Sequence, residues 1–170
     1  MIRGGTEIVF LGLGTNLGDR EENLRKALLL TGEHMGRIIE ESSVYETEPR
    51  GFTSRISFLN MAVKLETGLD PSGLLGKALM LETMMGRLRK GKGYNSRIID
   101  IDILLFGNRV IETTDLIIPH PRLHERRFVL LPLSGIAADI IHPVLGKSIA
   151  ELLKECRDDG KITEYGKNYL

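Results

Sequence analysis

The sequence lacks the residues for a disulfide framework or a cysteine-rich metal centre, because Cys156 is its only cysteine among 170 residues. A single cysteine can neither form an internal disulfide nor build a zinc site of that kind. Tryptophan is absent and aromatic residues make up only 5% of the chain. That composition argues against a sheet that binds RNA by stacking bases on exposed aromatic side chains.

The chain also lacks an excess of charge of either sign, because 23 Lys and Arg residues balance 23 Asp and Glu residues. It therefore has no overall field to attract nucleic acid or an anionic membrane, and any anion site must rest on local charge. The first residues, MIRGGTEIVFLGLG, lack the apolar run of a signal peptide, and no stretch approaches the roughly 20 apolar residues that span a bilayer. We expect a cytoplasmic enzyme or binding domain with no membrane or nucleic-acid partner.

What is present is the composition of an ordinary globular protein, with 42% hydrophobic and 27% charged residues. This length suits one domain with one sizeable core. We therefore predict a single domain over residues 1–170, with a core at about 7–156 and a polar, loosely ordered tail at about 157–170.

Apolar runs and turn residues predict an α+β fold. Asp19 and Asp70 are typical helix N-caps, and Pro71 suits a first helical position. Gly107-Asn108 favours a tight hairpin. The expected strands are 7–13, 37–48, 57–67, 97–106 and, across that hairpin, 109–112; the expected helices are about 20–36, 70–89 and parts of 119–137 and 148–156. This β-α-β-β-α-β order is that of a ferredoxin-like core, here with extra strands and C-terminal helices.

Two aspartates interrupt the apolar segment RIIDIDILLF at 97–106. Burying two carboxylates one residue apart is costly, so the segment implies an ion-pair network, a turn mistaken for a strand, or a bound cation. In a strand, Asp100 and Asp102 project from one face with Cα atoms roughly 6.5–7 Å apart. That spacing suits Mg²⁺ held by two carboxylates, phosphate oxygens and water. The plainer alternative is an acidic pair on the solvent face of an amphipathic strand.

Basic residues cluster on either side of this acidic segment. Helix ends and solvated loops account for some such charges, but two clusters beside an Asp-x-Asp pair favour a polyphosphate bound with Mg²⁺. The first cluster is Arg87, Arg89, Lys90, Lys92 and Arg97, around the glycine-rich loop KGKGYNS; the second is His120, Arg122, His124, Arg126 and Arg127.

The usual nucleotide motifs are missing. The segment GLGTNLG does not have the glycine spacing of a dinucleotide site, and we interpret Gly12, Gly14 and Gly18 as a tight connection from strand to helix. No convincing nucleophile or general base is evident.

A third region carries Thr47, Pro49 and Gly51 before the strand that contains Asn60. A buried amide needs hydrogen-bond partners. Asn60 either reads the edge of a flat heterocycle, with Phe58 or Phe128 on its face, or bonds a loop backbone.

Six segments occur in an order that resembles the 6-hydroxymethyl-7,8-dihydropterin pyrophosphokinase family of folate biosynthesis. The most specific are RIIDIDILLFG and IPHPRLHERRFVLLPL; the others are LGLGTNLGDR, SSVYETEPRG, FLNMAVKLET and ETMMGRLR. The resemblance covers about residues 8–145. It implies a ferredoxin-like α+β fold and transfer of pyrophosphate from ATP to the pterin hydroxymethyl group, leaving AMP.

The resemblance also implies roles for individual residues. These are Asp100 and Asp102 for two Mg²⁺ ions; Arg87 and Arg97 for catalysis; Glu82, Arg89, His120 and Arg126 for ATP; and Thr47, Asn60, Tyr94 and Phe128 for the pterin. Two departures are Ser96, where the family often has proline, and Asp115, where some members have a basic residue beside adenine. A monomer acting on small molecules is the default expectation.

Two other functions remain open from the sequence. A ferredoxin-like RNA-binding or regulatory module would bind RNA in a salt-dependent way without consuming ATP. A kinase that transfers a single phosphoryl group would release ADP rather than AMP.

Overall fold

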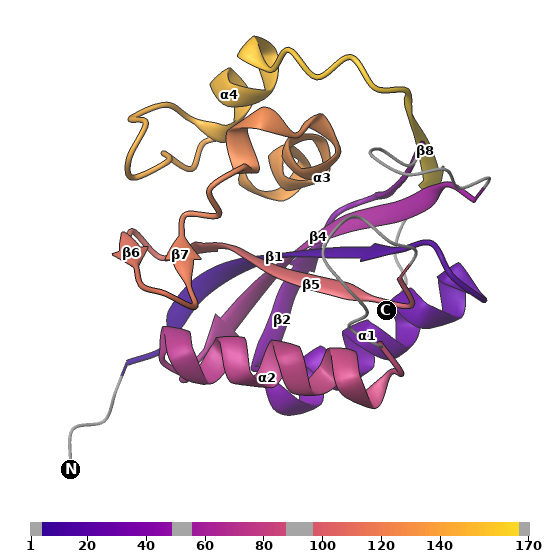
Figure 1. The fold of residues 1–170 in the computed structure, drawn as a ribbon. Coiled ribbons are helices and arrows are strands. Elements are labelled where there is room, and N and C mark those ends of the chain that lie inside the picture. The colour runs from indigo at the N-terminus through magenta and orange to yellow at the C-terminus, as the bar shows by residue number, and fades with distance from the viewer. Residues whose placement is uncertain (1–4, 49–55, 88–96, 167–170) are drawn as a thin grey trace.

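The protein folds around an antiparallel β-sheet with helices on both faces (Figure 1). The computed structural model describes residues 5–48, 56–87 and 97–166. Its elements are β1 (Glu7–Thr15), α1 (Arg20–His34), β2 (Arg37–Glu41), β3 (Val44–Thr47), β4 (Phe58–Thr67), α2 (Pro71–Met84), β5 (Asp100–Phe106), β6 (Ile111–Glu112), β7 (Ile117–Ile118), the 3₁₀ turn η1 (Leu123–Glu125), α3 (Arg127–Ala137), α4 (Ile149–Glu155) and β8 (Ile162–Gly166). None of the helices in these ranges is long and apolar enough to cross a bilayer. The predicted α+β class is confirmed.

The main sheet runs in the order β5-β1-β4-β3-β8, and β2 pairs with the other end of β4. The segment predicted as one strand at 37–48 is therefore two strands. Ser42 separates them: its backbone N–H donates to the Ala62 carbonyl, and its hydroxyl accepts from the Ala62 N–H at 2.8 Å. A side chain thus replaces one carbonyl of the ladder, and the chain bends there.

Each face of the sheet packs against its own pair of helices (Figure 1). The helices α1 and α2 cover the face that carries Val9, Leu11 and Leu13 of β1. The helices α3 and α4 cover the opposite face, where Phe10 and Leu104 are buried. Side chains of a strand alternate between faces, so β1 contributes to both cores.

The predicted helix starts are confirmed. The Asp19 carboxylate accepts from the Glu22 N–H at 3.0 Å. The Asp70 carboxylate accepts from the Gly73 N–H at 2.8 Å, and Pro71 is the first helical residue. Each cap satisfies a backbone donor that the first helical turn leaves unpaired.

Two predictions about the connections are wrong. No ladder joins β5 to residues 109–112 within the described chain; β6 pairs with β7 instead. The tight turn at Gly107-Asn108 does form, because the Arg109 N–H donates to the Phe106 carbonyl at 3.0 Å, but the Gly107 N–H donates to the Ile8 carbonyl of β1. The tail is also more ordered than expected, because β8 pairs with β3 and the Tyr165 hydroxyl donates to Glu21 at 2.7 Å.

Candidate active site

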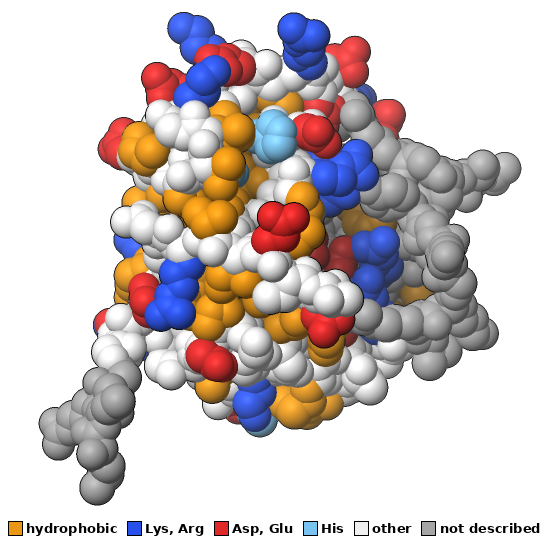
Figure 2. Space-filling view, turned by 60° about the vertical axis from the view of Figure 1, so that its left-hand side comes forward, with side chains coloured by type: hydrophobic (Ala, Val, Ile, Leu, Met, Phe, Trp, Pro, Cys, Tyr) orange, Lys and Arg blue, Asp and Glu red, His pale blue; other side chains and the backbone are white. Residues whose placement is uncertain are grey.

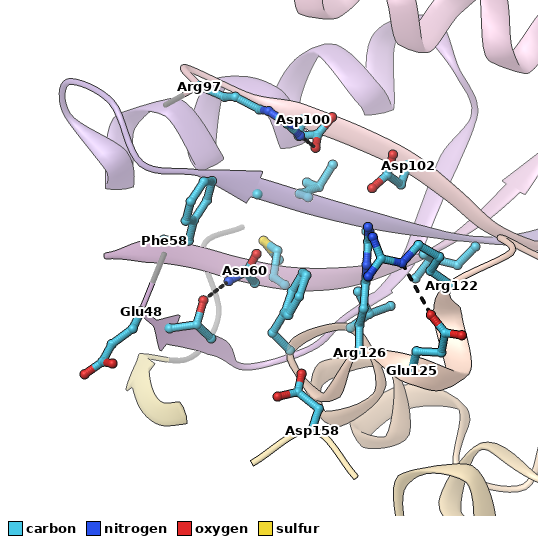
Figure 3. A pocket seen from close by; sticks show the side chains of 18 residues that line it. Glu48, Phe58, Asn60, Arg97, Asp100, Asp102, Arg122, Glu125, Arg126 and Asp158 are labelled. Atoms are coloured by element: carbon cyan, nitrogen blue, oxygen red, sulfur yellow. Dashed lines mark hydrogen bonds and ion pairs between the residues drawn. The ribbon is translucent and has the colours of Figure 1, made fainter. Parts of the chain in front are cut away.

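A pocket of about 320 Å³ opens between the sheet and the start of α3 (Figure 3). This size falls in the usual range for small-molecule sites. Its lining comes from four strands, η1, α3 and the segment before β8: Gly12, Leu13, Gly14, Thr47, Glu48, Phe58, Asn60, Met61, Arg97, Asp100, Asp102, Leu104, Arg122, Glu125, Arg126, Phe128, Val129 and Asp158. Residues from nearly the whole chain therefore meet at one cavity. In the space-filling view, Arg and Lys side chains gather beside a hollow on one side of the molecule (Figure 2).

Two glycines of β1 form part of the pocket floor. Gly14 pairs with Asn60 on one side and with Asp100 on the other, and Gly12 pairs with Asp102. A Cβ at Gly14 would lie 3.1 Å from Asn60 Oδ1, which is a tight contact. The absence of side chains leaves the sheet open between the amide and the carboxylates. Our interpretation of these two glycines as a strand-to-helix connection is wrong; only Gly18, at φ +70°, lies in that turn.

Asp100 lies in an ion-pair network at the start of β5. Arg87 Nη1 is 2.6 Å from Asp100 Oδ1, and Arg97 Nη1 pairs with Oδ2 of the same carboxylate. Figure 3 shows Arg97 directed at Asp100. The segment is a strand and not a turn, so one of the three explanations for the buried aspartates is removed. Ion pairing offsets the charge of Asp100 in this structure.

Asp102 has a different environment. Its side chain forms no hydrogen bond or ion pair with the described residues, although Figure 3 shows Arg126 extending toward it from across the pocket. Burial, followed by repulsion from the Asp100 carboxylate, raises the pKa of Asp102 to about 7. A cation placed beside such a carboxylate stabilises its ionised form and lowers its pKa.

Glu82 anchors the arginine that reaches Asp100. It is buried at 2% exposure on α2, and its Oε1 accepts from the Ile101 N–H at 2.9 Å and from Arg87 Nη1 at 2.5 Å. Burial lowers the pKa of Arg87, but the carboxylates of Asp100 and Glu82 outweigh that effect and hold it above its ordinary value. Arg87 therefore joins α2 to the acidic strand as a permanent cation.

His120 is a neutral side chain behind the pocket. Burial, and secondly the positive charge of Arg126, lower the pKa of His120 to about 4. Its Nδ1 accepts from the Arg122 N–H at 3.2 Å, which places the ring proton on Nε2. At neutral pH this histidine offers one N–H donor and no charge.

The other end of the pocket contains an amide and two aromatic rings. Asn60 Nδ2 donates to Thr47 Oγ1 at 2.8 Å, so its partner is a side chain and not a loop backbone. Asn60 Oδ1 has no hydrogen-bond partner among the residues described and is accessible from the pocket. Phe58 and Phe128 line the same cavity, and the Arg126 guanidinium lies 5.8 Å from the centre of the Phe128 ring. This end can hold a flat ring with polar edges.

The predicted site residues fall into three groups. Seven line the pocket: Thr47, Asn60, Arg97, Asp100, Asp102, Arg126 and Phe128. Three lie behind it and act on its charges: Glu82, Arg87 and His120. Arg89 and Tyr94 lie outside the described residues, as does Ser96. Asp115 is exposed just before β7.

Sequence reasoning missed several lining residues. The spacing of two between Gly12 and Gly14 is the signal that could have placed them on one strand face. Asp158 had no such signal. Its carboxylate accepts from the Arg127 and Gly160 N–H groups, each at 3.0 Å, and these contacts bring the segment after α4 to the start of α3.

Comparison with known proteins identifies the family of this chain. The family model described as 7,8-dihydro-6-hydroxymethylpterin-pyrophosphokinase (HPPK) matches residues 10–138. The 2-amino-4-hydroxy-6-hydroxymethyldihydropteridine pyrophosphokinase of Bacillus subtilis is 44% identical over 78% of this chain and 80% of its own length. The enzyme of the same name from Porphyromonas gingivalis is 42% identical over 80% of this chain and 94% of its own.

Longer proteins match as well. Folic acid synthesis protein fol1 of Pneumocystis carinii is 38% identical over 89% of this chain, which spans only 20% of that protein. Among solved structures, Plasmodium falciparum HPPK-DHPS superimposes with a TM-score of 0.72 at 20% identity, covering 91% of this chain and 45% of its own. That structural likeness supports the fold alone. The chain belongs to the HPPK family.

Proposed function

We propose that this protein transfers the pyrophosphoryl group of ATP to 6-hydroxymethyl-7,8-dihydropterin in folate biosynthesis. The pterin hydroxyl oxygen bonds to the β-phosphorus, the bond from that phosphorus to the α–β bridging oxygen breaks, and AMP leaves while the hydroxyl proton passes to solvent. The observation that carries the proposal is the acidic pair Asp100 and Asp102 in a pocket that also contains Arg97 and Arg126. The family membership supports the same reaction.

The acidic pair suits magnesium. The two carboxylates face one cavity, and no group of three or more His, Cys, Asp or Glu side chains within the described ranges could form a closed metal cage. Mg²⁺ is commonly held by one or two carboxylates with phosphate oxygens and water, so Asp100 and Asp102 would hold two ions together with ATP. When bound, the ions neutralise phosphate charge and orient the transferring group.

The arginines would stabilise the negative charge of the phosphates that the metal ions do not neutralise. In phosphoryl-type transfer, positioning and charge stabilisation dominate. Arg97 and Arg87 reach Asp100 from two sides and are placed to stabilise charge on the transferring group. Arg126, with neutral His120 behind it, orients the nucleotide, as does Glu82 through Arg87. We assign no general base.

The pterin would occupy the end of the pocket lined by Thr47, Asn60 and Phe128. The free Oδ1 of Asn60 accepts from a ring-edge N–H, while Phe128 packs on the ring face. This orientation directs the hydroxymethyl group toward the acidic strand, because Gly14 alone separates Asn60 from Asp100 across the floor. We assign Arg89 to ATP and Tyr94 to the pterin on the family resemblance.

We also infer that the core is ferredoxin-like. With β2 and β3 counted as one interrupted strand, the order β5-β1-β4-β3 supports that topology. Residues 1–170 would form one domain, with its core at about 7–156, that acts as a monomer.

The test is to incubate the purified protein with ATP, Mg²⁺ and 6-hydroxymethyl-7,8-dihydropterin and to separate the products by chromatography. We expect AMP and pterin diphosphate in equal amounts, with no product after addition of EDTA. Asp102→Asn should reduce turnover at least a hundredfold. Asp139→Asn, an exposed change in the turn after α3, is the matched control and should retain full activity.

Each other result has a definite meaning. ADP as the product would make the protein a single-phosphoryl kinase. Salt-dependent RNA binding without turnover would favour a binding module. Full activity in Asp102→Asn would rule out the aspartate pair as the metal site.

A further inference from the structure

The turn between β1 and α1 contains a buried amide that binds the backbone of a distant residue. Asn16 is fully buried. Its Oδ1 accepts from the Arg97 N–H at 2.7 Å, and its own N–H donates to the Arg97 carbonyl at 3.0 Å. The two residues are 81 positions apart. One asparagine thus satisfies both backbone groups of an arginine that lines the pocket.

The turn that carries Asn16 is itself braced by α1. Asn23, in the first turns of that helix, donates through Nδ2 to Thr15 Oγ1 at 3.1 Å and to the Leu17 carbonyl at 2.7 Å. Gly18 supplies the left-handed backbone conformation that ends the turn, at φ +70°. Asn16 is therefore held from both sides by a helix and a strand of the core.

The backbone of Arg97 fixes where its side chain begins. Arg97 precedes β5 by three residues, and its guanidinium pairs with Asp100 across that short interval. The side chain of Asn16 is not part of the pocket lining, whereas Arg97 is. The two backbone contacts with Arg97 are therefore a direct route by which Asn16 can affect a ligand in the pocket.

We propose that Asn16 is a positioning residue that sets the backbone of Arg97, and through it the guanidinium, against the transferring phosphates. The inference rests on the proposed function, in which Arg97 stabilises charge as the phosphorus–oxygen bond breaks. A misplacement of about 1 Å can reduce a rate a hundredfold. Because the defect lies in the transition state, kcat should fall and KM for both substrates should change little.

The decisive variant is Asn16→Leu, which keeps the size of the side chain and removes the acceptor for the Arg97 N–H. We expect kcat to fall roughly ten- to hundredfold. Asn16→Asp keeps an acceptor oxygen and should recover most of that loss. Leu152→Ala, on the buried face of α4, is the stability control: activity per folded molecule should stay at the wild-type level although the melting temperature falls.

A double-mutant cycle separates positioning from general damage. If Asn16 acts only through Arg97, Asn16→Leu combined with Arg97→Ala should be no slower than Arg97→Ala alone. Additive losses, or an unchanged kcat in folded Asn16→Leu, would overturn the inference.

A readout without turnover keeps this test independent of the proposed reaction. Amide hydrogen exchange measured by NMR should show the Arg97 N–H protected in the wild type and exchanging at least tenfold faster in Asn16→Leu, with amides of β4 unchanged. Equal exchange in both proteins would refute the role of Asn16 in holding the Arg97 backbone. A wild type that shows this protection but forms no AMP would refute the proposed function alone.

Discussion

At the scale of single residues, burial determines which side chains around the pocket carry charge. His120 is the clearest case, because burial and Arg126 lower its pKa to about 4, whereas an unfolded histidine titrates near about 6.5. Between these values the unfolded chain binds the proton and the folded chain does not. Stability from this group is therefore fully present above about pH 6.5 and is lost as the pH falls toward 4.

The change His120→Asn removes this pH dependence. We expect the variant to lose less stability than the wild type between pH 6.5 and 4.5, because no buried imidazole has to be kept neutral. Urea unfolding at several pH values measures the slope of the free energy of unfolding against pH. His124→Asn, an exposed change four residues on, should keep the wild-type slope; the same slope in all three proteins would show that His120 does not titrate as described.

Asp102 makes the opposite contribution. Burial and Asp100 raise its pKa to about 7, above the roughly 3.9 of an unfolded aspartate. The metal-free fold therefore loses stability as the pH rises from about 4 to about 7, and the loss levels off at higher pH. Asp102→Asn should raise the melting temperature of the metal-free protein at pH 8 and have little effect at pH 4. Differential scanning calorimetry in EDTA tests this. An unchanged or lower melting temperature at pH 8 would contradict the assigned environment.

At the scale of elements, α1 is tied to the strands that flank the proposed pterin end. Arg20 Nη1 donates to Glu46 of β3 at 2.8 Å and to the Ser57 carbonyl before β4 at 2.7 Å. These two contacts hold the strand ends that carry Thr47 and Phe58. The first turn of a helix thus sets the width of the pocket at that end.

Arg20→Gln should therefore loosen the proposed pterin site selectively. We expect KM for the pterin to rise roughly three- to tenfold, which corresponds to about 1 kcal/mol of binding free energy, while KM for ATP stays unchanged. Steady-state kinetics with each substrate varied measures both constants. The control is Arg25→Gln on the same helix, at 53% side-chain exposure, and equal increases in both KM values would contradict this role.

Local signals in the sequence predicted where the helices begin. Contacts between distant residues determined the features that were predicted wrongly. Asp19 and Asp70 act on backbone groups within three residues, so the helix starts were readable. Ser42 interrupts a strand through Ala62, and β8 exists because β3 offers it an edge. Neither partner is visible from nearby residues, which explains the wrong predictions for the strand at 37–48 and for the tail.

The same distinction holds for the candidate site. The period of two in a strand is a local property, so it was enough to place Asp100 and Asp102 on one face. The hydrogen bond from the Arg97 N–H to the Asn16 side chain joins distant parts of the chain, and no pattern within either segment indicates it. Family resemblance supplied roles for residues such as Glu82, but not the ion pair through which Glu82 reaches Asp100.

At the scale of the whole molecule, the pocket joins segments from Gly12 to Asp158, so ligand binding should stabilise the entire fold. A ligand present at one hundred times its Kd adds about 2.7 kcal/mol to the free energy of unfolding. For a chain of this size that corresponds to roughly 5–10 °C in melting temperature. A non-hydrolysable ATP analogue with Mg²⁺ should produce this shift.

The dependence of that shift on metal distinguishes the two ends of the pocket. EDTA, or Asp100→Asn, should abolish the stabilisation by the nucleotide analogue, because Asp100 and Asp102 are its proposed link to the phosphates. Stabilisation by 6-hydroxymethyl-7,8-dihydropterin alone should survive EDTA, since Thr47, Asn60 and Phe128 need no cation. Thermal unfolding with each ligand, with and without EDTA, gives the four values required. A pterin shift that vanishes with EDTA would mean that the metal and pterin ends are not separate, and that the assignment of Asn60 to the ring edge is wrong.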